Sequence, residues 1–146
     1  MCGIAVVLGQ DDTNLAKSMV ANIAHRGPDG FGTWSDDYCS LGHARLSIVD
    51  LIGSNQPIGS EHGCWLVQNG EIYNFDELRK KYHSYNWVTK GDSEVILAAH
   101  KTNNMSQINR RVETSSIIGW IRRTSTVEAN GNPAQRHVDW VSKLDG

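Results

Sequence analysis

The chain has 146 residues, 39% of them hydrophobic, and a formal net charge of −2, which is the composition of one globular domain of ordinary size. It contains no apolar run near the roughly 18 residues that a membrane-spanning helix needs. Its first residues lack the basic and apolar segments of a signal peptide. The sequence therefore predicts a cytoplasmic protein that does not bind membranes.

Metal and nucleotide motifs are missing from the sequence. The cysteines Cys2, Cys39 and Cys64 fit neither a disulfide framework nor a zinc motif. The six histidines are scattered, without metal-binding spacing, and neither of the common glycine-rich phosphate motifs is found. We therefore expect no metal site and no cofactor in this chain. Cys39 and Cys64 are expected to be buried as small hydrophobic residues.

The first half of the chain alternates strand and helix signals. The apolar run Gly3–Leu8 predicts a buried strand, and Asn14 predicts the N-cap of a helix over Leu15–His25. After a loop at 26–30, short strands are expected at Phe31–Trp34, Ser40–His43 and Leu46–Val49. This half should therefore form several strands and one helix.

Turn and cap signals organise the middle of the chain. Trp65–Gln68 predicts another strand, and Asn69-Gly70 predicts a hairpin whose returning strand is Glu71–Tyr73. Asn74 and Glu77 have the spacing of a capping box, which predicts that a short helix follows.

The sequence changes character near residue 101. Just before it, Asp92 predicts the N-cap of a helix that carries Val95, Ile96 and Ala99. Residues 1–100 carry 7 Lys and Arg against 12 Asp and Glu, whereas residues 101–146 carry 7 against 4. The second segment shows no clear helix or strand period, and its basic charge is too thin to indicate a nucleic-acid interface. The predicted organisation is a domain over 1–100 and a divergent tail of unknown fold over 101–146.

Cys2 is the first candidate for chemistry because it follows the initiator Met1. Removal of Met1 would leave a thiol and a free α-amino group on one residue. The reference pKa of such an amine is about 7.7–8.0, so near neutral pH it can act as a general base toward its own side chain. A cysteine at this position is weak evidence alone, and the segments that accompany it decide its meaning.

Six segments occur in order along the first hundred residues. They read MCGIAVVLG at the start, AHRGPDG at 24–30, GHARLSIVDL at 42–51, QP at 56–57, NGEIYNFDELR at 69–79 and KGDSEVILAAH at 90–100. Together they resemble the class II glutamine amidotransferases, which use an N-terminal cysteine, and they are most similar to asparagine synthetases. The resemblance covers about residues 1–100.

The resemblance assigns roles to particular residues. It makes Cys2 the nucleophile, and it builds the oxyanion hole from the side-chain amide of Asn69 and the backbone N–H of Gly70. It places Arg45 on the α-carboxylate of glutamine, which a guanidinium fork suits, and Asp92 on the α-ammonium. Further implied roles fall on the glutamine contacts Ser47, Ile48, Val49 and Glu71, and on Arg26 at the mouth of the pocket near Cys2.

The implied fold is α+β, the four-layer αββα sandwich of the N-terminal nucleophile hydrolases. We expect it to be incomplete at its C-terminal end, because the Phe-rich strand and Arg-Asp segment that usually complete such a domain are missing after Lys101. The tail either replaces those strands or results from truncation or a frameshift. The change in composition favours the second explanation.

The implied reaction converts L-glutamine and water to L-glutamate and ammonia through a thioester on Cys2. It is the glutaminase half-reaction of asparagine biosynthesis. ATP and Mg²⁺ belong to a synthetase (ligase) domain that nothing in this chain matches. Two alternatives stay open. One is a non-catalytic remnant that binds glutamine or a partner chain, and the other is a glutaminase subunit that feeds ammonia to a separate synthetase.

Overall fold

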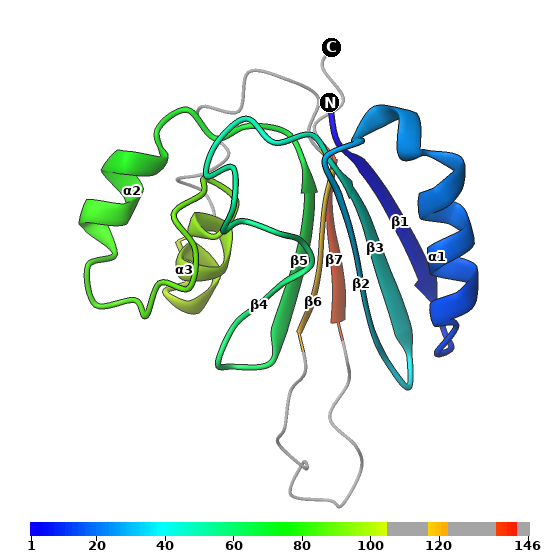
Figure 1. Cartoon of the computed structure of the whole chain (residues 1–146). Helices are drawn as coiled ribbons and strands as arrows, with labels where there is room; N and C mark the ends of the chain where they lie inside the picture. The colour runs from blue at the N-terminus through cyan, green and yellow to red at the C-terminus, as the bar shows by residue number, and fades with distance from the viewer. Residues whose placement is uncertain (105–116, 123–136, 143–146) are drawn as a thin grey trace, which may run out of the picture.

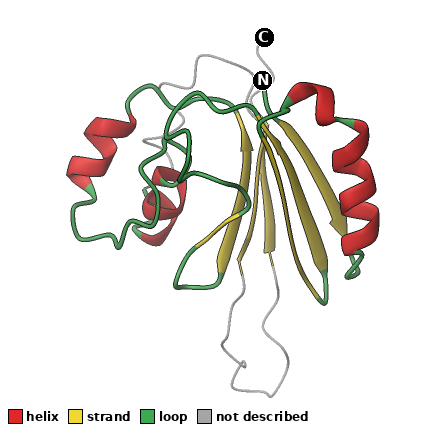
Figure 2. Cartoon of the chain, in the orientation of Figure 1, coloured by secondary structure: helices red, strands yellow, loops and turns green. Residues whose placement is uncertain are grey.

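The computed structural model describes residues 1–104, 117–122 and 137–142, and it combines helices with two antiparallel sheets (Figures 1 and 2). In chain order the elements are β1 (Gly3–Leu8), α1 (Thr13–Asn22), a 3-10 turn (Ala24–Arg26), β2 (Gly30–Asp36), β3 (Cys39–Arg45), β4 (Ile58–Gly59), β5 (Cys64–Asn69), α2 (Phe75–Lys81), α3 (Val95–Lys101), β6 (Ile117–Arg122) and β7 (His137–Ser142). The mixture of helices and sheets agrees with the fold class that the resemblance implied.

The first sheet has the order β1-β3-β2, and α1 lies against it. Its central strand β3 presents Ser40, Gly42 and Ala44 toward the helix. A Cβ atom on Gly42 would come within 2.4 Å of Val20 Cγ2 in α1. These small residues therefore let the helix lie directly on the sheet, at the close packing that protein interiors need.

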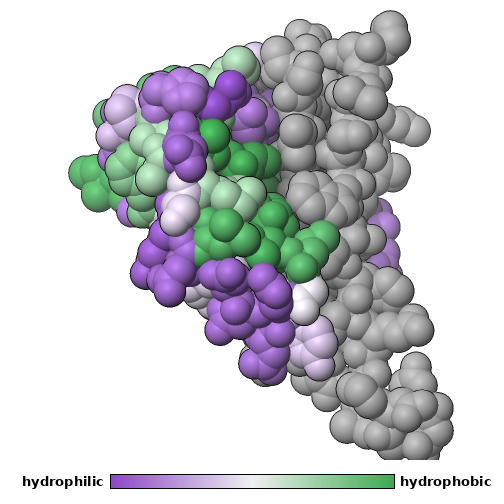
Figure 3. Space-filling model, turned by 90° about the vertical axis from the view of Figure 1, so that its right-hand side faces the viewer, coloured by the Kyte–Doolittle hydropathy of each residue, from purple (hydrophilic) through white to green (hydrophobic). Residues whose placement is uncertain are grey.

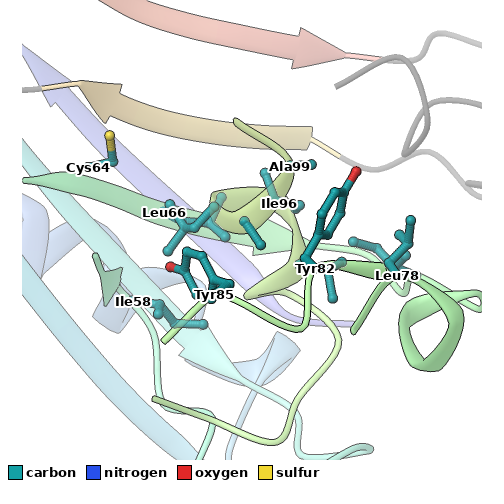
Figure 4. Close-up of a cluster of buried hydrophobic side chains, with 12 residues drawn as sticks. Ile58, Cys64, Leu66, Leu78, Tyr82, Tyr85, Ile96 and Ala99 are labelled. Atoms are coloured by element: carbon teal, nitrogen blue, oxygen red, sulfur yellow. The ribbon is translucent and has the colours of Figure 1, made fainter. Parts of the chain in front are cut away.

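The second sheet has the order β4-β5-β6-β7, and α2 and α3 lie on the side that faces away from the first sheet (Figure 1). A buried apolar cluster joins this sheet to the two helices (Figure 4). Its members are Ile58, Cys64, Leu66, Ile72, Leu78, Tyr82, Tyr85, Val95, Ile96, Leu97, Ala98 and Ala99. Burial of these side chains stabilises the packing of the helices on the sheet.

The two sheets face each other between the helices (Figure 1). Cys39, Leu41 and Val67 form a buried cluster there. Beside it, Trp34 of β2 stacks on Trp65 of β5 with ring centroids 4.6 Å apart. Aromatic stacking of this kind adds to the free energy gained by burial. The expectation that Cys39 and Cys64 are buried is confirmed.

One buried polar contact also joins the two sheets. His43 Nε2 in β3 lies 3.2 Å from the backbone oxygen of Gln68 in β5. Burial lowers the pKa of His43 to about 4, so its imidazole is neutral at pH 7 and can donate to that oxygen. This contact gives His43 a structural role between the two sheets.

Most predicted strands are confirmed, with somewhat different bounds. The runs at 3–8, 31–34, 40–43 and 65–68 lie in β1, β2, β3 and β5. The predicted strand over Leu46–Val49 is wrong, because this segment is a loop. The predicted hairpin at Asn69-Gly70 is also wrong: Glu71–Tyr73 forms no strand, and β5 pairs with β4 and β6 instead.

Two helix starts differ from the predicted caps. Asp12, not Asn14, caps α1, because its side chain accepts a hydrogen bond from the backbone N–H of Leu15 at 2.8 Å. Asn74 does precede α2, but its side chain makes no capping bond. The capping box with Glu77 is therefore wrong, although the predicted helix exists.

The segment after residue 101 supplies strands that the sequence pattern did not reveal. β6 pairs with β5 in antiparallel register, with Ile117 opposite Asn69, and β7 pairs with β6. The edge of β5 is therefore paired rather than open. The domain boundary at residue 100 stays a prediction, although this sheet crosses it.

We predict that Gly42→Ala destabilises the domain by about 1–3 kcal/mol, because the added methyl group overpacks the contact between β3 and α1. Urea-induced unfolding would measure the loss. Gly30→Ala in β2 is the matched control, since its Cβ would lie 3.8 Å from the nearest atom. An unfolding free energy of Gly42→Ala equal to that of the control would contradict this view of the packing.

Candidate active site

A pocket of about 230 Å³ lies where the ends of β1, β3 and β5 meet the loops after β3 and before α3. Its lining consists of Met1, Cys2, Arg45, Leu46, Ile48, Val49, Ser54, Gln56, Asn69, Gly70, Glu71, Tyr73, Asp92 and Ser93. The fold therefore brings together every residue with a predicted catalytic or glutamine-binding role except Ser47. Their roles remain predictions at this point, but their convergence is an observation.

A second hollow, of about 490 Å³, lies between α1 and β2. Figure 3 views the molecule from the side that carries α1 and shows apolar patches next to polar ones. The lining of the hollow is Lys17, Val20, Ala21, Ala24, Phe31, Gly32 and Thr33. It offers no thiol, imidazole or carboxylate, so the pocket near Cys2 is the better candidate for chemistry.

Cys2 is held in the pocket by the end of β3. The pairing of Gly3 with Ala44 brings the preceding Cys2 close to Leu46. The backbone N–H of Leu46 donates to Cys2 Sγ at 3.4 Å, and the thiol can donate to the Leu46 oxygen at 3.6 Å. Arg26 Nε donates to the backbone oxygen of Cys2 at 3.1 Å. Arg26 thus lies beside Cys2 but outside the pocket lining, and its role at the mouth of the pocket stays a prediction.

Arg45 ends β3 and is only 6% exposed. Its Nη1 donates to the backbone oxygen of Leu51 at 3.3 Å and to Asn55 Oδ1 at 3.0 Å. Its Nη2 donates to the oxygens of Val49 and Asp50. Arg45 therefore shapes the loop after β3 as well as lining the pocket. Since these carbonyls turn toward the cation, they are not available to a neighbouring strand.

Asp92 lies in the loop before α3 and is 9% exposed. Its Oδ2 accepts a hydrogen bond from the backbone N–H of Ile72 at 2.8 Å. The predicted N-cap role is wrong, because α3 begins at Val95 and the Asp92 carboxylate points to Ile72 instead. Burial raises the pKa of Asp92, although the backbone hydrogen bond from Ile72 opposes this shift. A cation bound beside the carboxylate would favour its ionised form.

Arg45 and Asp92 give the pocket one buried positive and one buried negative charge. Within residues 1–104, neither side chain forms an ion pair with another. Buried charges without a partner of opposite sign are unfavourable. A ligand that carries both a carboxylate and an ammonium group would provide a partner for each. The pocket is therefore suited to the zwitterionic end of an α-amino acid.

Asn69 and Gly70 border the pocket at the end of β5, and Glu71 follows them. Asn69 pairs with Ile117 of β6, which holds its backbone in place; a preorganised oxyanion hole would require such a fixed backbone. Ser47 is the exception among the predicted residues. It is outside the lining, and its backbone N–H donates to Asp29 Oδ2 at 2.7 Å.

The sequence of the chain matches the family described as "Glutamine amidotransferase domain" over residues 1–126. This match covers most of the chain. The chain belongs to the glutamine amidotransferase domain family. The matched region extends past residue 101 and includes β6.

Several relatives of this amidotransferase domain are asparagine synthetases. It is 38% identical over 111 residues to "Asparagine synthetase [glutamine-hydrolyzing] 1" of Bacillus subtilis, a match that covers 69% of this chain and 18% of that protein. It is 42% identical over 102 residues to "Asparagine synthetase [glutamine-hydrolyzing] 2" of Oryza sativa, covering 66% and 17%. The chain thus spans about a fifth of the length of these curated relatives.

Gln56 is a residue of the amidotransferase pocket that sequence reasoning left without a role. Its Oε1 accepts from the backbone N–H of Gln68 at 2.6 Å, and its Nε2 donates to Ser93 Oγ at 3.2 Å. Gln56 thereby joins β5 to the loop that carries Asp92. The QP segment pointed to this position, but its sequence could not reveal which groups the side chain would contact.

Cys2 differs from the other two cysteines of the amidotransferase domain in its exposure. Burial raises the pKa of Cys39 to about 12, and Cys64 is also buried, whereas Cys2 is partly exposed in the pocket. Over residues 1–104 no cluster of His, Cys, Asp and Glu side chains is arranged to hold a metal ion. No helix in the described parts of the chain is long and apolar enough to cross a membrane.

Proposed function

We propose that this domain hydrolyses L-glutamine to L-glutamate and ammonia. The observation that carries the proposal is the convergence of a thiol, a buried cation and a buried anion in one pocket. Arg45 would bind the α-carboxylate of glutamine and Asp92 its α-ammonium, with Ile48, Val49 and Glu71 as further contacts. Held at both charged ends, the substrate would present its side-chain amide to Cys2, which is the positional part of catalysis.

The reaction proceeds in two balanced steps. The Cys2 thiolate attacks the amide carbon, the C–N bond breaks, and the nitrogen leaves as ammonia once it has gained a proton. Water then attacks the resulting γ-glutamyl thioester, which releases glutamate and restores the thiol. The developing oxyanion accepts hydrogen bonds from the Asn69 side chain and the Gly70 backbone N–H.

The α-amine of Cys2 supplies the base in this mechanism, so Met1 must be removed. Met1 is 75% exposed and borders the pocket, a position from which removal would not disturb the core. The amine thus exposed would lie on the nucleophile's own residue. With a reference pKa of about 7.7–8.0 it can take the thiol proton near neutral pH.

The fold supports this assignment at a coarse level. Two facing sheets with helices on their outer sides are the arrangement from which the four-layer αββα sandwich of the N-terminal nucleophile hydrolases is built. We propose that the complete domain has this sandwich fold. In it, Cys2 would lie at the start of β1 and beside the end of the central strand β3.

The similarity to asparagine synthetases suggests where the ammonia goes. We propose that a synthetase domain or subunit receives it for asparagine synthesis, and that ATP and Mg²⁺ act there rather than in this chain. The glutaminase step needs no cofactor, since the thiol, the amine and the oxyanion hole come from the chain itself. We also propose that the protein is cytoplasmic and binds neither nucleic acids nor membranes.

We predict that Cys2→Ala abolishes release of glutamate from glutamine, because no other group in the pocket lining is a thiol. An enzyme-coupled glutamate assay on mass-verified chains would measure it, and chains that retain Met1 should also be inactive. Cys39→Ala removes a thiol outside the pocket and should keep activity. If glutamine binds but the processed chain never turns it over, the alternative of a non-catalytic glutamine-binding remnant is favoured.

The pKa of Asp92 gives a second prediction. Only the ionised carboxylate pairs with an ammonium, so glutamine binding should weaken as the pH falls through the pKa of Asp92, which is raised above its ordinary value of 3.8. Calorimetric titration of glutamine into Cys2→Ala would show this without interference from catalysis. Adding Asp92→Asn should weaken binding about tenfold or more and remove the pH dependence. Equal affinity with and without Asp92→Asn would refute the clamp.

A further inference from the structure

The carboxylate of Asp50 accepts hydrogen bonds from two different loops near the pocket. Within its own loop it accepts a hydrogen bond from the backbone N–H of Gly53 at 3.0 Å and one from Ser54 Oγ at 2.6 Å. Across the gap it accepts one from the backbone N–H of Lys90 at 2.9 Å. A single side chain thus links the loop after β3 to the loop that carries Asp92.

These two loops also approach each other very closely. A Cβ atom on Gly91 would lie 2.2 Å from Ser54 Oγ, so only glycine fits there without displacing the serine. Asp50 itself has a φ of 48°, a left-handed conformation that is unfavourable for a residue other than glycine. Hydrogen bonds to its carboxylate offset this strain. Its backbone oxygen also accepts a hydrogen bond from Arg45 Nη2, so it is held from both sides.

The second loop has its own support on the far side. Arg79 of α2 donates to the backbone oxygens of Thr89 at 2.6 Å and Gly91 at 3.2 Å, and its guanidinium lies 4.1 Å from the ring centre of Trp87. This support ties the loop to α2 but not to the pocket. On the pocket side, the bond from Lys90 to Asp50 acts together with the bond from Gln56 to Ser93 to position this loop relative to the Arg45 side.

We propose that Asp50 is a positioning residue that holds the two charged ends of the glutamine clamp at their working separation. Arg45 fixes one loop and Asp92 belongs to the other, and Asp50 joins the two. The inference rests on the proposed glutaminase function. It assigns Asp50 no contact with glutamine.

The Asp50 carboxylate accepts all the hydrogen bonds of the linkage. Its Oδ2 accepts from Ser54 and Lys90 and its Oδ1 from Gly53, so an amide with its oxygen at the Oδ2 position would keep the bond to Lys90. Hydrogen bonds from Ser54 and Lys90 lower the pKa of Asp50, which favours its ionised form. Asp50→Ala removes both acceptor oxygens and therefore breaks the linkage.

The test compares Asp50→Ala with the unmodified chain, after removal of Met1. We expect its KM for glutamine to rise about tenfold, as for the loss of one charge-assisted hydrogen bond between the loops, while kcat stays within about threefold. Hydrogen exchange should also become faster at the Lys90 backbone amide. Asp37→Ala, at an exposed aspartate outside the pocket, is the matched control and should change neither quantity.

Two results would overturn the proposal for Asp50. A parallel loss of kcat and melting temperature with unchanged KM would reduce Asp50 to a structural residue and overturn the proposal, as would unchanged exchange at Lys90. Ser54→Ala keeps the carboxylate and removes one donor, so it serves as a milder variant with a smaller rise in KM if Asp50→Ala does not fold. If the unmodified chain shows no glutaminase activity, the proposed function fails. The exchange measurement still reports then whether Asp50 holds the loop.

Discussion

The antiparallel register of β1 against β3 is the constraint on which the site depends. Gly3 lies opposite Ala44, and this pairing brings Cys2 to the backbone of Leu46 at the end of β3. A shift by one residue would exchange the two faces of the strand. Arg45 would then face α1 instead of the pocket, and the small residues that admit the helix would face the other sheet. The packing of α1 and the placement of Cys2 therefore depend on the same register.

The pocket gains its character from charges that the scaffold leaves without ionic partners. Arg45 uses its terminal nitrogens on the carbonyls of the loop after β3, which gives it a fixed position but does not neutralise it. Within residues 1–104, Asp92 similarly receives a backbone hydrogen bond but no cation. Buried charges without partners are unfavourable in an empty pocket, and a zwitterion would provide a partner for each. An amino acid could therefore supply both partners, whereas an isolated amide could supply neither.

The site could be predicted from the sequence further than the fold that surrounds it. Segments such as NGEIYNFDELR identified the candidate residues, and the structure places all the predicted catalytic and glutamine-binding residues except Ser47 around one pocket. The errors arose where a long-range contact overrides a local signal. Asn69-Gly70 has the composition of a hairpin turn, yet the strand that pairs with β5 comes from Ile117–Arg122. Asp92 resembles a helix cap, yet its carboxylate meets the amide of Ile72. Neither partner is visible in local sequence.

The central claim is that Cys2 attacks the side chain of a glutamine held by Arg45 and Asp92. A glutamine analogue with a diazomethyl ketone in place of its amide tests this claim directly, because its diazo carbon takes up a proton and then bonds to a nearby thiolate sulfur as N2 leaves. Intact and peptide mass spectrometry would locate the label. The account predicts one label on Cys2, only in chains without Met1, and protection by excess glutamine. Labelling of Cys39 or Cys64 instead, or equal labelling of chains that retain Met1, would contradict it.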